Sequence, residues 1–283
     1  MKIRRPVLAA STTTCLAMLA ACAAGRTPDA VVNATATGSA APACGCTDAD
    51  GMPAPPPLRL YAGAIDKSAV EGKPAEALTW LRRSFAAGHE QPSRALAEAA
   101  FAPIRRDGAL RMQLHALLRE FACESSADMV AADEPGERIV IRGIVVDAGG
   151  TPVGGARVYA FHTDATGHYS ELGLDESNPR LFVYLCTDDA GRFEFRTIRP
   201  GHYPIPANPS PNEGRGADGI EQHVHMHVAA GGFVAREHRL GFADDPFWAR
   251  TRQQPPAWAV AGTRSGPNAE LQFDHRIVLQ RRS

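Results

Sequence analysis

The stretch EQHVHMHV, from Glu221 to Val228, alternates histidine with apolar residues. On a β-strand, successive side chains point to opposite faces of the sheet. The pattern therefore predicts a strand with one apolar face toward a core and three imidazoles on the other face. His223, His225 and His227 would then be a solvated polar face or part of a metal site, because i and i+2 imidazoles can bind one ion.

Five further short runs have the composition of strands. They are rich in β-branched and aromatic residues, and the turn sequences DAGG, DDAG and RPGHYP stand between them. Short strands at this spacing are typical of a β-sandwich. We expect a mainly β fold, with the sandwich formed by residues 136–283. The predicted strands are residues 138–146, 156–163, 181–187, 192–198 and 270–279.

A short α-helical segment, residues 61–130, is expected before the sandwich. Pro74 suits the first position of a helix, Gly88 suits a helix end, and Ser93 could cap a second helix. A stripe at helical spacing marks a third helix, and it would pack inside a small bundle or form a dimer interface. The stripe is Leu110, Leu114, Leu117 and Phe121.

The N-terminus has the features of an export signal. Residues 1–21 combine a basic start, a moderately apolar run and LAA directly before Cys22. This resembles a bacterial lipoprotein signal, in which the cysteine is lipidated. Ala23 fits sorting to the outer membrane, and residues 22–60 have the composition of a flexible tether. We expect a periplasmic protein anchored by lipid at Cys22, with an ordinary signal peptide as the alternative.

Export would place the remaining cysteines in an oxidising compartment. Cys15 would leave with the signal, and Cys22 would carry lipid, so four cysteines are available for pairing. Cys44 and Cys46 are too close in sequence to pair comfortably with each other. A bridge from that pair to Cys123 is one possibility. The fourth available cysteine is Cys186.

The chain has 283 residues, of which 44% are hydrophobic, and this is enough for a sizeable core. The formal net charge of −1 gives no argument for a nucleic-acid partner.

Two tyrosines stand beside predicted strand ends, where functional loops are common. Tyr169 follows the strand ending near residue 163, and Tyr203 lies in the turn RPGHYP. Each alone would be an ordinary half-buried tyrosine. Together with two imidazoles, the two tyrosines form a possible set of metal ligands, because phenolate is a hard anionic oxygen donor. Such a set favours Fe(III) over zinc or copper(I).

At these positions the chain resembles the intradiol ring-cleavage dioxygenases, the catechol and protocatechuate dioxygenase family. The likeness runs over residues 141–246 and keeps the order Tyr, Tyr, His-x-His. It implies a β-sandwich that holds one non-haem Fe(III) per chain. It also implies an enzyme that uses O2 to cleave a small aromatic diol between its two hydroxylated carbons. A homodimer is a further expectation.

The resemblance assigns roles residue by residue. Tyr169 matches the first, equatorial tyrosine, and Tyr203 the axial tyrosine that leaves the iron when catecholate binds. His223 and His225 match the histidine pair. The shifted pair of His225 and His227 is the alternative.

Three positions depart from the family pattern. The family's arginine before the first histidine is Ile220 here, its later glutamine is Arg239, and a tryptophan near the first tyrosine is Phe161. Arg239 could supply the missing positive charge from the other side of the site, as a catalytic residue. The alternative is that Arg239 is a surface strand residue and the site is catalytically altered.

Two other classes of protein compete with the enzyme. The strands and the turn TPVGGA also resemble carboxypeptidase-regulatory or transthyretin-like binding modules. A zinc or copper protein that uses all three histidines is the other alternative. The set of Tyr169, Tyr203, His223 and His225 distinguishes the dioxygenase from the binding module, which has no need of that set. Colour distinguishes all three classes, because an Fe(III)–phenolate protein is red to burgundy and a zinc protein is colourless.

Overall fold

The computed structural model describes residues 56–204, 219–264 and 269–282. The expected signal peptide, the lipidated Cys22 and most of the tether lie outside these residues. None of the described helices is long and apolar enough to cross a membrane.

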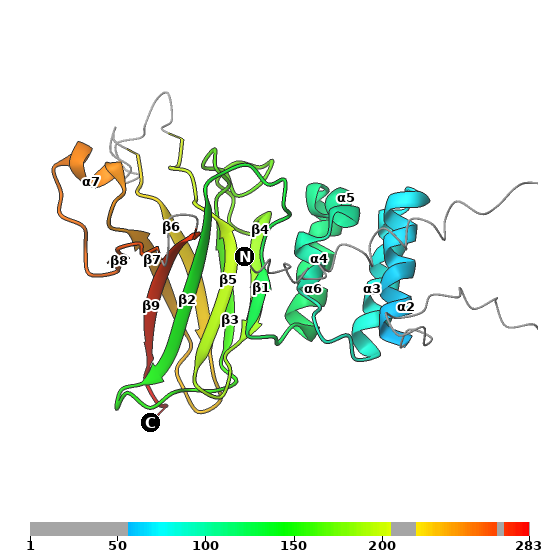
Figure 1. Ribbon diagram of the computed structural model, residues 1–283, viewed down its shortest axis with the longest axis horizontal. Coiled ribbons are helices and arrows are strands. Elements are labelled where there is room, and N and C mark those ends of the chain that lie inside the picture. The colour runs from blue at the N-terminus through cyan, green and yellow to red at the C-terminus, as the bar shows by residue number, and fades with distance from the viewer. Residues whose placement is uncertain (1–55, 205–218, 265–268, 283) are drawn as a thin grey trace, which may run out of the picture.

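Two β-sheets pack face to face in the C-terminal part of the chain (Figure 1). One sheet has the order β1-β5-β2-β9 and the other the order β4-β3-β6-β7-β8. The chain is therefore mainly β and forms the expected sandwich. The strands are β1 Ser126–Asp128, β2 Arg138–Asp147, β3 Arg157–His162, β4 Leu181–Cys186, β5 Arg192–Ile198, β6 His223–Ala229, β7 Arg236–Phe242, β8 Ala259–Val260 and β9 Leu271–Leu279.

Alternating apolar residues build the core between the sheets. Val224, Met226 and Val228 of β6 are all buried, as the sequence pattern predicted. They share the core with Phe195 and Phe273 from the opposite sheet. The other face of β6 is thereby left for the histidines.

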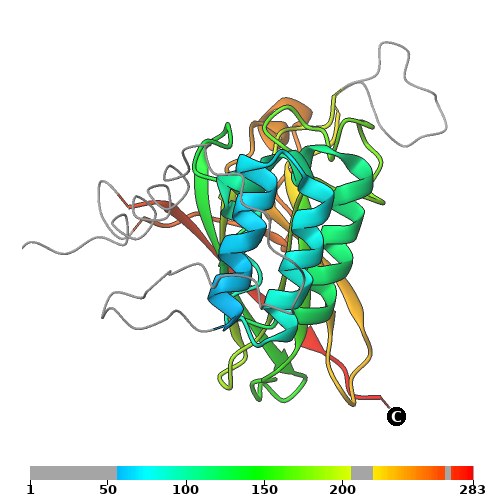
Figure 2. The ribbon, with the colours of Figure 1, turned by 90° about the vertical axis from the view of Figure 1, so that its right-hand side faces the viewer.

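A layer of helices lies beside the sandwich and next to β1 and β4, as Figure 2 shows face-on. Pro74 begins one of these helices, and Gly88 follows it with a φ of +91°, a conformation that favours glycine. Asp107 caps another by accepting hydrogen bonds from two backbone amides. The helices of this layer are α2 Pro56–Ile65, α3 Pro74–Ala86, α4 Arg94–Ala97, α5 Ala102–Arg106 and α6 Gly108–Phe121, with a π-helix Asp66–Val70 and a 3₁₀ helix Ala99–Phe101. Helix α7, Pro246–Thr251, lies on the other side of the sandwich, near β8.

The leucine stripe packs inside the chain. Leu114 and Leu117 of α6 are buried in the common core, and Leu110 and Phe121 pack at its edge. The stripe is therefore occupied by intramolecular packing. The homodimer stays a prediction without an assigned surface.

The element boundaries differ from expectation in two places. Helix α2 begins at Pro56, inside the range that we expected to be tether, because proline is well suited to a first helical turn. Strand β1 lies within the expected helical segment and pairs in parallel with β5.

The disulfide in the structure differs from the possible bridge between the Cys44 and Cys46 pair and Cys123. Cys123, just after α6, pairs with Cys186 at the end of β4, and not with Cys44 or Cys46. The register of the fold decides this pairing, because it brings the two positions to a Cα separation of 4.6 Å. Cys44 and Cys46 themselves lie outside the described residues.

Candidate metal centre

Two Gly-His-Tyr segments bring the tyrosines together. Gly167 precedes Tyr169 by two residues, and Gly201 precedes Tyr203 by two. The backbones of the segments approach so closely that a side chain at Gly167 would meet the carbonyl oxygen of His202. A side chain at Gly201 would likewise meet the backbone of Ala165. Glycine is thus required at both positions for the two loops to pack.

Asp245 connects the second tyrosine loop to the histidine strand. Its buried carboxylate contacts Nε2 of His202 at 2.7 Å and accepts a hydrogen bond from the backbone N–H of Gln222 at 2.7 Å. It also caps α7 by accepting from the Phe247 amide. One side chain therefore aligns the residue before Tyr203 with the residue before His223.

The four predicted ligands lie in mutual contact. The hydroxyls of Tyr169 and Tyr203 hydrogen-bond to each other. The Tyr203 hydroxyl lies 3.2 Å from Nε2 of His223, and that nitrogen lies 3.0 Å from Nε2 of His225. All four side chains are buried, with exposed fractions of 7% or less. Two oxygens and two nitrogens therefore converge on one small region.

Hydrogen bonds on the far side of each ring fix the histidine tautomers. Nδ1 of His223 donates to the carbonyl oxygen of Glu221 at 2.8 Å, because a carbonyl can only accept. Nδ1 of His225 donates to the Glu237 carboxylate at 3.2 Å. Burial lowers the pKa of His223 to about 3 and also lowers that of His225. Both rings are therefore neutral at pH 7, with the lone pair on Nε2.

Such an arrangement fits a metal ion. Two imidazole lone pairs 3.0 Å apart repel each other unless a cation or a proton lies between them. Burial and the neighbouring Tyr203 raise the pKa of Tyr169, so its phenolate also needs a cation nearby. In the described part of the chain, no group of three His, Cys, Asp or Glu side chains is placed to hold a metal. A metal at this position would therefore need the phenols as well as the imidazoles.

His227 does not join the four. It is exposed, stacks against Phe161 at a centroid distance of 5.8 Å, and lines a separate pocket. The structure thus brings His223 and His225 against the tyrosines, rather than His225 and His227.

Arg239 lies opposite His225 on the neighbouring strand β7. Its side chain is 45% exposed, and its guanidinium donates to the Glu221 carboxylate at 3.1 Å and lies over the ring of Trp258. Its charge opposes the burial that raises the pKa of Tyr169, so it acts on the site electrostatically. Ile220 packs against the core and brings no charge.

Sequence reasoning missed three groups that support the site. Glu237 faces His225, and Glu176 approaches Nε2 of His225 to 3.9 Å. Arg111 of α6 is fully buried, pairs with Glu171 at 2.9 Å and donates to Asn178, so it fixes the loop that carries Glu176. Of these groups, only Glu237 could have been found from the sequence. The turn AAGGFV indicates that the segment after it pairs with the histidine strand, and this pairing places Glu237 beside the histidines.

A β-sandwich with two phenols and two neutral imidazoles in contact has the donor set of a protein that binds one hard metal ion. The family model described as Dioxygenase matches residues 120–263, slightly more than half of the chain. The chain belongs to this dioxygenase family. The family resemblance in the sequence is thereby confirmed.

Similar proteins carry related names. Hydroxyquinol 1,2-dioxygenase from Rhizobium sp. is 29% identical over 42% of this chain and 42% of its own length. Chlorocatechol 1,2-dioxygenase from Rhodococcus opacus is 34% identical over 41% of this chain and 48% of its own length. The chain thus matches less than half the length of these relatives. The crystal structure of 3-chlorocatechol 1,2-dioxygenase from Rhodococcus opacus 1CP aligns with 57% of this chain and 68% of its own, at 24% identity and a TM-score of 0.47.

Proposed function

We propose that the chain is a non-haem Fe(III) intradiol dioxygenase. It would use O2 to cleave a catechol-type ring between its two hydroxylated carbons. The observation that carries the proposal is the convergence of Tyr169, Tyr203, His223 and His225. Membership of the dioxygenase family and the names of the relatives support the same reaction.

Ferric iron, when bound, would stabilise both phenolates and withdraw electron density from a catecholate, so that the ring reacts with O2. The four residues named above would hold it. Tyr169 is the more deeply buried phenol, with 1% of its surface exposed against 7% for Tyr203. Tyr203 lies in a loop after β5, whereas the histidines lie on a strand. It is therefore the ligand better able to move aside for a substrate.

The position of Tyr203 also suits proton transfer. Its hydroxyl lies between the Tyr169 hydroxyl and Nε2 of His223. A displaced Tyr203 phenolate could accept one proton from a catechol hydroxyl as the diol binds. Arg239 would stabilise the negative charge that develops on the ring, from the strand beside His225.

The proposal is tested by supplying catechol and isotope-labelled O2 to the iron-loaded protein, and by measuring O2 uptake and the label in the product. We expect one O2 consumed per ring and both oxygen atoms in a cis,cis-muconate-type diacid. Tyr169→Phe should abolish the reaction. Absence of O2 uptake, or cleavage beside the hydroxylated carbons, would contradict the proposed function.

We also propose that the protein is exported and anchored by lipid at Cys22, facing the periplasm from the outer membrane. Two independent features support this. The sequence before Cys22 has the pattern of a lipoprotein signal. The Cys123–Cys186 disulfide is of the kind that persists in oxidising compartments.

Changing Cys22 to serine should remove the anchor. We expect the parent protein to take up labelled palmitate and fractionate with membranes, and Cys22→Ser to lose both properties. Cys15→Ser is the matched control, because Cys15 lies inside the expected signal peptide. Equal labelling of the parent and Cys22→Ser would refute the lipid anchor.

A further inference from the structure

A continuous surface of stacked rings extends from His225 across three strands. In the register of the sheet, His225 lies opposite Phe161, and His227 lies opposite Tyr159, which in turn faces Tyr184. These side chains share one face of the sheet. Neighbouring rings lie 4.8 Å apart for His225 and Phe161, 5.2 Å for Phe161 and Tyr159, and 4.6 Å for Tyr159 and Tyr184. We name Phe161, Tyr159, Tyr184 and His227 the aromatic platform.

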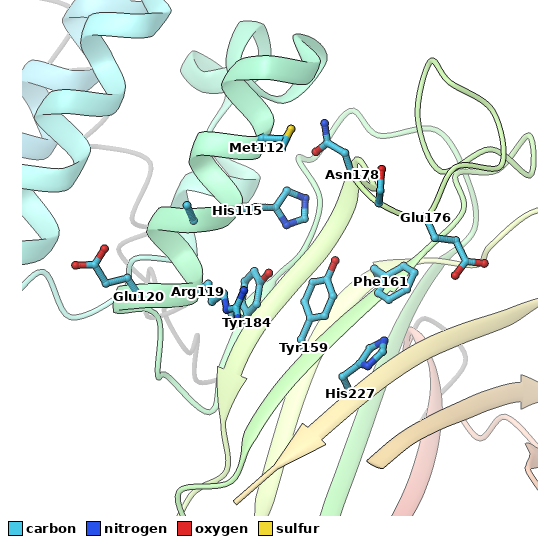
Figure 3. Close-up of a pocket in the computed structure, with 12 residues that line it drawn as sticks. Met112, His115, Arg119, Glu120, Tyr159, Phe161, Glu176, Asn178, Tyr184 and His227 are labelled. Atoms are coloured by element: carbon cyan, nitrogen blue, oxygen red, sulfur yellow. The ribbon is translucent and has the colours of Figure 1, made fainter. Parts of the chain in front are cut away.

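The aromatic platform forms one wall of a pocket of about 850 Å³ (Figure 3). Helix α6 forms the opposite wall, from which His115 points toward the platform. His115 is itself held in place, because it stacks on Phe182 at 3.4 Å and contacts the carbonyl oxygen of Pro179 at 2.9 Å. The pocket therefore has aromatic groups on both walls, and the walls meet where His115 contacts Tyr159 and Tyr184 edge-on, with ring centroids 6.2 Å apart in each pair.

The pocket adjoins the candidate metal centre. Phe161 lines the pocket and stacks on His225 with an interplanar angle of 6°. It also contacts the ring of Tyr169 at 5.7 Å. Glu176 lines the pocket and approaches His225 to 3.9 Å. The metal centre and the pocket therefore meet at Phe161 and Glu176, and the part of a bound molecule that extends past these two side chains would enter the pocket.

The polar groups of the pocket suit a hydroxylated, uncharged ring. The hydroxyls of Tyr159 and Tyr184 and the ring nitrogens of His227 make no hydrogen bond to any described residue. They are available to a ligand that stacks on the platform. The charged lining residues are Arg119, Glu120 and Glu176, so acidic groups outnumber basic ones. The excess of negative charge in the lining disfavours a ligand that carries an anionic group into the pocket.

We propose that the pocket binds the second aromatic ring of a two-ring catechol, whose diol ring lies at the metal centre. The preferred substrate class is then an aryl-substituted catechol rather than a single ring. This inference rests on the proposed function.

The test compares two probes, catechol and 3,4-dihydroxybiphenyl, on the iron-loaded protein. We expect kcat/KM to favour the two-ring diol by about tenfold, the size of a single good ring-stacking contact. Anaerobic calorimetry, in which no turnover occurs, should show the same preference in Kd. Tyr184→Leu and His227→Ala should each lower the ratio of the two kcat/KM values, and Tyr184→Phe should keep most of it because the ring remains.

The control is Trp80→Leu, which removes a half-buried aromatic ring of α3 outside the pocket and should leave the ratio unchanged. Circular dichroism checks that each variant folds. If catechol is cleaved as well as the two-ring diol and the platform variants leave the ratio unchanged, the second-ring site is wrong and the dioxygenase stands. If neither diol is cleaved, the proposed function fails, and the substrate class fails with it.

Discussion

Arg239 is the residue at which this chain departs most informatively from its family. Ile220 stands where the resemblance places an arginine and packs on the core, so in the proposed enzyme a cation for the substrate would come from another residue. Arg239 lies on β7 directly across from His225. Its guanidinium is held by Glu221 and by the ring of Trp258, which orients it without burying it.

We expect Arg239→Gln to keep the iron and its colour but to lower catechol turnover by about two orders of magnitude, the usual effect of removing one such donor. Arg239→Lys should recover only part, because a point charge does not reproduce the planar fork. Steady-state kinetics together with metal content measure both effects. Arg282→Gln is a matched control, because Arg282 donates to the Phe233 carbonyl and lies outside the site. Full turnover by Arg239→Gln would show that the cation is not Arg239.

At the scale of residues, the four candidate ligands could be predicted from the sequence, because each stands in a recognisable short pattern. Two tyrosines follow Gly-His, and two histidines alternate along a strand. The surrounding groups have no such pattern. Arg111 reaches Glu171 and Asn178 across 60 and 67 positions of the chain, and only the fold shows these contacts. The same holds for His115, which meets the aromatic platform from α6.

At the scale of elements, the Cys123–Cys186 bridge joins the end of α6 to the end of β4. It closes a loop with a sequence separation of 63 residues. In the chain-entropy model such a bridge stabilises the folded state by about 4 kcal/mol. Because α6 forms one wall of the pocket, the bridge also ties that wall to the sheet.

We therefore expect the double variant Cys123→Ser, Cys186→Ser to unfold at lower denaturant concentration than the parent protein. Adding dithiothreitol should lower the midpoint of the parent but not that of the variant. Urea titrations with and without the reductant measure this. A parent midpoint that the reductant leaves unchanged would contradict a stabilising role for the bridge.

The positions of most strands could be predicted from the sequence, whereas the first and last residues of the helices could not. The six predicted strands appear as β2 to β6 and β9, because β-branched runs between glycine turns have few other structures open to them. Strands β1, β7 and β8 were not in the sequence-based set, since short or polar strands such as β7 depend on the neighbour they pair with. The cysteine pairing was left open by the sequence for the same reason, because it depends on how α6 packs against β4.

At the scale of the whole molecule, buried histidines make stability depend on pH. Burial lowers the pKa of His115, His162 and His275 to about 4 each, from an ordinary value of 6.5. Between these values the unfolded chain binds protons that the folded chain does not. Stability is therefore fully present above about pH 6.5 and falls as the pH drops toward 4.

Replacing His162 with glutamine should reduce this dependence. His162 is fully buried between the Thr163 carbonyl and the Thr197 hydroxyl, and glutamine can contact such groups without titrating. Each such histidine adds roughly 1.4 kcal/mol per pH unit to the slope of the unfolding free energy. Urea unfolding at pH 5 and pH 7 should show a smaller difference for His162→Gln than for the parent. Equal differences would show that His162 titrates normally in the fold.

The most direct test of the account is metal analysis combined with a visible spectrum of the purified protein. We predict one iron per chain and a red to burgundy colour from charge transfer between phenolate and Fe(III). His223→Ala should lose the iron and the colour, whereas the neighbouring His227→Ala should keep both. A colourless parent protein, or one that holds zinc instead of iron, would contradict the two-tyrosine, two-histidine iron centre.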